Sequence, residues 1–130
     1  MNAPFDAVPC NRLLGLQLVH RSADRVEVHL PVRPELLQEE GIVQGGLLTA
    51  LADTAAVYLL WPDLPPDRTM TGLGCSMQFL SPGRLQDGPL VAIATPLKKG
   101  RTVAVCDSVV QQGERLVARG TFTFLLQERR

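Results

Sequence analysis

Asp53 is the side chain of this sequence that most clearly invites a chemical interpretation. It is the only residue charged at neutral pH within residues 45–61, a run of small and apolar side chains with the length of a helix. No cation stands three or four positions away to pair with it along a helix, and it lies too deep in the run to cap the helix start. A buried carboxylate without a partner destabilises a fold, and such groups are commonly retained for chemistry. Two interpretations stay open: a catalytic carboxylate, or one that reaches solvent or a subunit boundary or pairs with a distant arginine.

Gly45 and Gly46 stand together at the start of the same run, directly after Gln44. Glycines at this place allow backbone N–H groups to approach a ligand without obstruction by a Cβ atom, and a helix N-terminus favours negative charge. An oxyanion held there, with Asp53 a little over two turns further along the helix, suits attack on a polarised carbonyl. The alternative for the glycines is close packing or an N-cap turn. Neither Walker nor G-x-G-x-x-G spacing is present, so a nucleotide-binding loop is not predicted.

The two histidines, His20 and His29, offer no competing chemistry. Neither lies near a Gly-x-Ser-x-Gly turn, and neither stands at metal-ligand spacing from another possible ligand. Serine-hydrolase and metal-hydrolase mechanisms are therefore not predicted, and no metal or cofactor is expected.

Composition restricts the partners and the compartment. Lysine and arginine together number 13, as do aspartate and glutamate, so the chain lacks the basic surface that nucleic-acid binding requires. Three widely spaced cysteines, Cys10, Cys75 and Cys106, predict reduced thiols rather than a disulfide framework. The first 12 residues do not resemble a signal peptide, and glycines and an aspartate interrupt the one long apolar run, which argues against a membrane span. The protein is expected in the cytoplasm.

The remaining sequence predicts the elements that must position these groups. Alternating apolar and polar residues predict strands at 26–30, 73–79, 90–97, 102–111 and 116–126. Short connections that contain Gly100 and Gly113 predict hairpins, and therefore antiparallel pairing. The helix at 45–61 ends where Pro62 cannot continue it.

This helix is apolar nearly all the way round, so it must be covered on most sides, and the sheet curled around it is the available cover. The predicted fold class is α+β: the hotdog fold, an antiparallel β-sheet wrapped around one long central α-helix. One domain over residues 1–130 is expected, with a flexible N-terminal segment at 1–12.

Residues 41–55 carry a family resemblance. Their pattern, Gly-x-x-Gln-Gly-Gly-x-x-x-x-Leu-Ala-Asp-Thr-Ala, resembles the G-x-x-H-G-G-x-x-x-x-L-x-D-x-A signature of the phenylacetyl-CoA (PaaI-like) hotdog thioesterases. Residues 78–82 are similar to that family's F-L-x-P strand end, residues 99–101 to its G-[RK] hairpin, and residues 116–122 to its last strand. The resemblance spans roughly residues 13–126.

The resemblance implies roles for individual residues. Asp53 would be the nucleophile or the general base that activates water, and Gly45 would supply the N–H that polarises the thioester carbonyl. Gln38 would orient the water or the carboxylate. Gln44 replaces the family's histidine, so it can donate a hydrogen bond but cannot titrate. Gly46 and Thr54 are candidates for substrate contact.

Three further expectations concern a hydroxyl side chain that this sequence lacks, a residue that binds phosphate and the assembly of copies of the chain. A serine or threonine that some relatives place on the following strand falls at Gly72 by spacing from Pro82, while Thr71 would point to the other face. Arg101 stands in a basic hairpin and is the candidate for binding the phosphates of CoA. A homodimer with the sheets joined edge to edge, paired again into a tetramer, is also implied.

The function that follows is hydrolysis of an acyl-CoA or aroyl-CoA to the free acid and CoA. The alternative is a non-catalytic hotdog module that binds a CoA ester or another apolar ligand.

Overall fold

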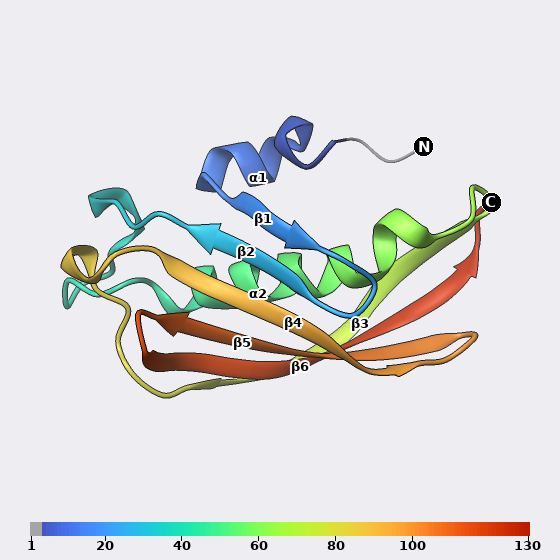
Figure 1. The fold of residues 1–130 in the computed structure, drawn as a ribbon. Coiled ribbons are helices and arrows are strands. Elements are labelled where there is room, and N and C mark those ends of the chain that lie inside the picture. The colour runs from blue at the N-terminus through green and yellow to red at the C-terminus, as the bar shows by residue number, and fades with distance from the viewer. Residues whose placement is uncertain (1–3) are drawn as a thin grey trace.

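Helix α2, Gly45–Leu60, is the centre of the fold. The computed structural model describes residues 4–130, and in it the helix lies in the hollow of a curled sheet (Figure 1). The helix ends one residue before the predicted boundary, because Pro62 cannot continue it and Trp61–Asp63 form a short 3-10 turn instead. The predicted central helix is therefore confirmed.

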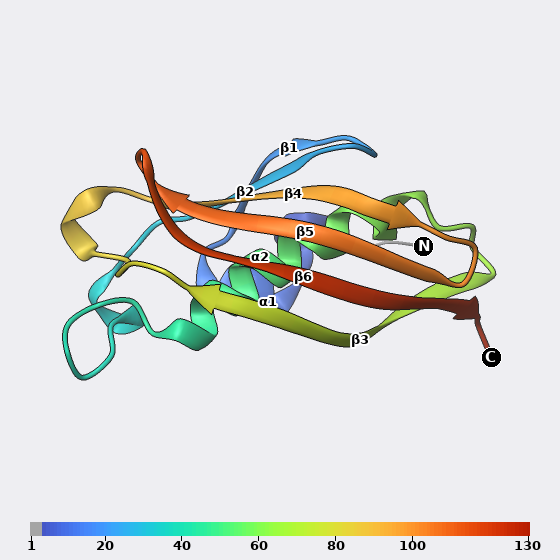
Figure 2. The same cartoon turned by 90° about the horizontal axis from the view of Figure 1, so that it is seen from below.

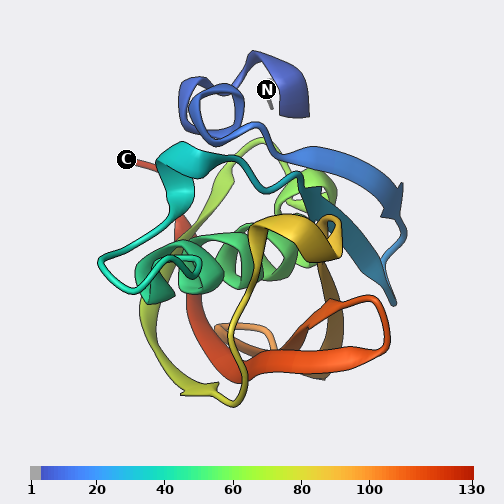
Figure 3. The ribbon, with the colours of Figure 1, turned by 90° about the vertical axis from the view of Figure 1, so that its left-hand side faces the viewer.

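Six antiparallel strands form a single sheet in the order β1-β2-β4-β5-β6-β3 (Figure 2). Their bounds are β1 Gln17–Arg21, β2 Val26–Leu30, β3 Arg68–Phe79, β4 Leu90–Lys99, β5 Val103–Gln112 and β6 Arg115–Glu128. The sheet curves round α2, as the view along the helix shows (Figure 3). All five predicted strands are present, and the hotdog fold is confirmed.

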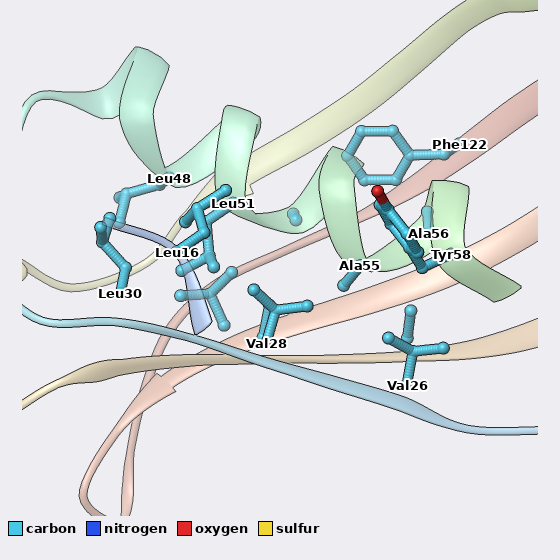
Figure 4. Packing of buried hydrophobic residues seen from close by; sticks show 14 of the residues in the cluster. Leu16, Val26, Val28, Leu30, Leu48, Leu51, Ala55, Ala56, Tyr58 and Phe122 are labelled. Atoms are coloured by element: carbon cyan, nitrogen blue, oxygen red, sulfur yellow. The ribbon is translucent and has the colours of Figure 1, made fainter. Parts of the chain in front are cut away.

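The alternation of side chains along the strands builds the core. Along β2 and the first half of β4, buried residues alternate with half-buried ones, because successive side chains of a strand point to opposite faces. The inward set packs on the aliphatic side of α2, where Val28 and Leu30 face Leu48 and Leu51 (Figure 4). This packing fixes the axial and rotational position of α2 against the sheet.

The two edge strands differ from the sequence-based expectation. β1 was not predicted; it is short, mostly exposed and irregular between Leu18 and His20, so it carries little periodic signal. β3 starts at Arg68, five residues earlier than predicted, and a bulge at Leu73 interrupts its pairing with β6. Its expected buried face is largely uncovered: Leu73 is 58% exposed and Phe79 57%. An edge strand has a neighbour on one side only, which is why the pattern overstated burial here.

The N-terminal segment requires a correction. Residues 1–12 were expected to be flexible, but Phe5–Ala7 form a 3-10 turn and α1 spans Pro9–Leu14; residues 1–3 lie outside the described part. The ring of Phe5 is buried 4.9 Å from that of Tyr58, and α1 ends at Gly15, whose φ of 77° suits glycine. One buried aromatic residue in a polar stretch was too weak a signal for the sequence to predict this packing.

Arg21 fastens the C-terminal end of α2 to the sheet. Its guanidinium donates to the carbonyl oxygens of Tyr58 and Leu59 at 2.8 and 3.1 Å and pairs with Asp63 at 2.8 Å. Carbonyls in the last turn of a helix have no partner inside the helix, so a cation there is stabilising. Over residues 4–130 no helix has the length and apolar character needed to cross a membrane.

Candidate active site

Asp53 lies on the face of α2 that points away from the aliphatic core. In the single chain its side chain is exposed, and among the described residues it has neither an ion pair nor a hydrogen bond. The protein that surrounds it withholds water from part of the carboxylate, and this burial raises its pKa above 3.8. The alternative of a distant arginine partner is therefore not observed, and the carboxylate faces solvent or a subunit boundary.

Gln44 organises the start of the helix. Its Oε1 accepts a hydrogen bond of 2.5 Å from the N–H of Gly46, which makes it the N-cap. A Cβ on Gly46 would come within 2.9 Å of that oxygen, so glycine there leaves room for the cap. The Nε2 group of Gln44 keeps both donors, since no described hydrogen bond uses them.

This arrangement distinguishes the two glycines. The N–H of Gly46 is occupied by Gln44, whereas the N–H of Gly45 takes part in none of the hydrogen bonds among the described residues. It lies at the positive end of the helix, where an orphan N–H favours an anion or a polarised carbonyl oxygen. The predicted oxyanion donor is therefore available at Gly45 and not at Gly46.

Gln38 is brought to the same place as Gly45. Both line a cavity of about 390 Å³ together with Leu48 and Phe79. Gln38 Oε1 accepts from the N–H of Glu40 at 2.5 Å, which leaves its amide NH₂ free to donate. Phe79, which no part of the sequence reasoning assigned to the site, places its ring 3.6–3.7 Å from the position of a Cβ on Gly45. The sequence-based prediction included Phe79 only as part of the F-L-x-P end of a strand.

Asp53 lines two other cavities. One, of about 240 Å³, lies against the middle of β3 and is shared with Thr49 and Gly72. The other, of about 320 Å³, lies between α2 and the N-terminal segment and is shared with Thr54 and Asn11. Thr54 donates to the carbonyl oxygen of Ala50 at 2.8 Å, so its hydroxyl is directed back along the helix. Gly72 lines the same cavity as Asp53 of its own chain, whereas the resemblance implied a residue that faces the site across the dimer. Its lack of a side chain leaves space beside the carboxylate.

Asp53 and Gly45 do not form one apparatus within a single chain. They are eight residues apart on α2, so about 12 Å of helix rise separates them, and they line different cavities. A carbonyl group cannot contact both at that distance. The expectation that one helix supplies both groups to the same carbonyl is wrong for geometric reasons.

Arg101 stands apart from these groups. It is exposed in the turn between β4 and β5, and its carbonyl oxygen accepts from Arg68 at 3.2 Å. Its side chain lines neither the cavity of Gly45 nor those of Asp53. Its role in binding phosphate stays a prediction.

Comparisons with known proteins agree with this architecture. The family model described as the thioesterase superfamily matches residues 40–119. A protein of Deinococcus radiodurans described as an esterase is 32% identical over 109 residues, which cover 84% of this chain and 71% of that protein.

Two solved structures extend the comparison. A thioesterase of Haemophilus influenzae has a TM-score of 0.86 at 25% identity, covering 95% of this chain and 85% of its own. A phenylacetic acid degradation-related protein of Ralstonia eutropha JMP134 has a TM-score of 0.84 at 28% identity, covering 95% and 92%. The resemblance to PaaI-like hotdog thioesterases is thus confirmed. The chain belongs to the thioesterase superfamily and is a hydrolase with the hotdog fold.

Proposed function

We propose that the protein hydrolyses acyl-CoA or aroyl-CoA thioesters to the free acid and CoA, in sites shared by two protomers. The observation that carries the proposal is a mismatch within one chain. Within residues 4–130 neither the Gly45 N–H nor the Asp53 carboxylate has a partner, yet about 12 Å of helix separates them. Each is one half of an acyl-transfer site, and a second copy can supply the other half.

The edge strand β3 supports such a pairing. It is 12 residues long, exposed along most of its length, and carries Leu73 and Phe79 uncovered. A long apolar edge with free backbone groups is a template for strand pairing. The opposite edge, β1, has five residues and an irregularity, and is a poorer template. We therefore place the dimer interface at β3, with the two sheets joined edge to edge.

We place the two-fold axis level with Thr49, and two features of the chain support this position. The middle of β3 lies at residues 73 and 74, and these line the same cavity as Thr49. Antiparallel pairing of β3 about its middle thus places the axis level with Thr49. On α2, Thr49 is midway between residues 45 and 53. A two-fold axis there sets Asp53 of one protomer opposite Gly45 of the partner subunit.

In this composite site the chemistry divides between the protomers. The Gly45 N–H polarises the thioester carbonyl and holds the oxyanion that forms. Asp53 either attacks the carbonyl carbon itself or takes a proton from water as the water oxygen adds. The C–S bond then breaks, and the sulfur leaves as CoA thiolate, which is protonated to the thiol. Where water has added, this releases the free acid directly. Where Asp53 has attacked, the acyl group stays on Asp53 as a mixed anhydride, which water then hydrolyses to the free acid and the Asp53 carboxylate. Gln38 and Gln44 carry free amide donors for the water and the thioester oxygen, and Gly46 and Thr54 contact the substrate.

The remaining parts of the proposal concern assembly and compartment. The dimers pair again into a tetramer, and the free thiols of Cys10, Cys75 and Cys106 are compatible with a reducing cytoplasm.

A thiol-release assay over a panel of acyl-CoA and aroyl-CoA thioesters tests the activity, combined with sedimentation at micromolar concentration for assembly. Turnover by a dimer or tetramer is expected. Binding of thioesters without release of thiol would support the alternative, a non-catalytic module, and would refute the catalytic proposal. A stable monomer that turns over thioesters would refute the shared site alone.

A further inference from the structure

The cavity between the N-terminal segment and α2 is built from parts of the chain far apart in sequence. Val8 and Asn11 line it from one side, and Val57, Tyr58 and Trp61 from the other. Asp53 lies on its wall, so the cavity opens onto the proposed reacting carboxylate. Most of its lining is apolar, which makes it suited to a hydrocarbon group and unsuited to the phosphates of CoA.

The N-terminal segment forms one side of this cavity. Phe5 packs on Tyr58 with the ring centroids 4.9 Å apart. Asn11 is 6% exposed and fixed by a hydrogen bond of 3.1 Å from its Nδ2 to the carbonyl oxygen of Phe5. Asn11 and Tyr58 lie together on the cavity wall. These contacts hold Val8 and α1 against α2, so the side of the cavity formed by the N-terminal segment is fixed in place.

That side of the cavity lies outside the part of the chain that the thioesterase superfamily model matches, which begins at residue 40. The groups assigned to bond cleavage, Asp53 and Gly45, lie inside it. The N-terminal segment is therefore separate from the groups assigned to bond cleavage, and a change in it can alter substrate choice while the chemistry is kept.

We propose that this cavity receives the acyl group of the thioester and that the N-terminal segment, through Val8 and Asn11, sets an upper limit on acyl size. The inference rests on the proposed hydrolysis. The preferred substrates are thioesters of compact acyl groups, and long fatty acyl groups are excluded. At about 320 Å³ the cavity is near the lower end of ligand pockets, roughly 300–1,000 Å³, and the buried Asn11 bounds it on the side of the N-terminal segment.

The test is a profile of kcat/KM against straight-chain acyl-CoAs from acetyl to dodecanoyl, with two substitutions of Val8. Val8→Phe fills the cavity and should lower the ratio of kcat/KM for the longest accepted chain to that for acetyl-CoA by at least about tenfold. Val8→Ala enlarges it and should raise the same ratio. One methylene in an apolar pocket changes discrimination by about 10–200-fold, so both shifts are measurable.

A matched control is Leu13→Phe, which adds a ring on α1 at a site that is 72% exposed and away from the cavity. It should leave the profile unchanged. If Val8→Phe does not fold, Val8→Ala alone decides by the direction of its shift. An active wild type whose profile is the same in both Val8 variants would overturn the inference and leave the proposed function intact. A uniform rise in KM for every thioester would overturn it as well. A wild type with no turnover on any thioester would overturn both.

Discussion

The two faces of α2 are built from different residues, although in the sequence the helix looks uniformly apolar. The face toward the sheet carries Leu48, Leu51, Ala55 and Leu59, each at most 3% exposed. The face away from the sheet carries small or polar side chains and Val57, and it is exposed or half-buried in the single chain; its members are Gly46, Thr49, Ala50, Asp53, Thr54 and Val57. A rotation about the helix axis thus separates packing from chemistry.

This difference shows how the fold stays stable although one face of α2 carries a destabilising, unpaired carboxylate. The leucines fix the position of α2 through burial on β2, β4 and β5, and Arg21 fastens its C-terminal end. Asp53 can then stay unpaired, because the packing on the opposite face offsets its destabilising effect. Two kinds of variant follow, one for each face, with opposite effects on stability and turnover.

Asp53→Asn should have the largest effect on the open face. Asparagine is nearly the same size, but it can neither attack the carbonyl nor take up a proton, so kcat should fall by about 10²–10⁴-fold. Because an awkward charge is removed, the melting temperature should hold or rise. Thioester turnover and melting temperature are measured on the same purified variant. A destabilised protein that retains its specific activity would contradict both the mechanism and the division between the faces.

Leu51→Ala should produce the reverse pattern on the packed face. Leu51 is fully buried, so its truncation should lower the free energy of unfolding by about 2–5 kcal/mol. Turnover per folded molecule at low temperature should change far less than in Asp53→Asn. Denaturant unfolding together with turnover at 10 °C below the variant's melting point measures both quantities. A loss of kcat comparable to that of Asp53→Asn would show that the faces are not separable.

The sequence predicted the interior of the fold better than its edges. The alternation in β2, β4, β5 and β6 and the apolar run of α2 reflect burial on a neighbour within the same chain, so period and structure agree. β3 has the same alternation, but as an edge strand it has a neighbour on one side only, so its apolar residues are largely uncovered in the single chain. β1 has little alternation because it is exposed and irregular. The N-terminal packing depends on one contact, Phe5 on Tyr58, which has no periodicity.

The candidate site was predicted in its parts and not in its geometry. Asp53 and Gly45 could be selected because a lone carboxylate and paired glycines are unusual in an apolar helix. Helix rise alone gives their separation of about 12 Å. The conclusion that they do not act on the same carbonyl within one chain also rests on the observation that they line different cavities. Phe79 and Asn11 were missed, since contacts between residues distant in sequence leave no local pattern.

Two substitutions of Gln44 separate its capping from its proposed donation, and their effects on activity should be smaller than that of Asp53→Asn. Gln44→Ala removes both and should lower kcat/KM about tenfold to a thousandfold and stability by about 1 kcal/mol. Gln44→Glu keeps an oxygen to cap Gly46 but has no amide donor, so it should retain stability and lose activity. Melting temperature and kcat/KM of the pair measure the two effects. Full activity in Gln44→Ala would show that the side chain has no catalytic role.

The smallest expected effect is a pH dependence in the stability gained by Asp53→Asn. Burial raises the pKa of Asp53 above 3.8, so the folded chain holds this proton more tightly than the unfolded chain does. Below pH 3.8 the carboxyl is protonated in both states and does not destabilise the fold. As pH rises through the raised pKa, ionisation favours the unfolded state, and the wild type loses stability that the asparagine variant keeps.

The difference in melting temperature, variant minus wild type, should therefore increase from acid pH and become constant above the raised pKa. Because partial burial is the cause of the raised pKa, the increase should be small, at most a few degrees. Thermal unfolding at half-unit steps from pH 3.5 to 7.5 measures it, with Asp24→Asn as the control, since Asp24 is an exposed loop residue outside the site. A difference that decreases with rising pH would mean that Asp53 gains a cation in the assembled protein, and that its face of α2 is held by an ion pair rather than left open for substrate.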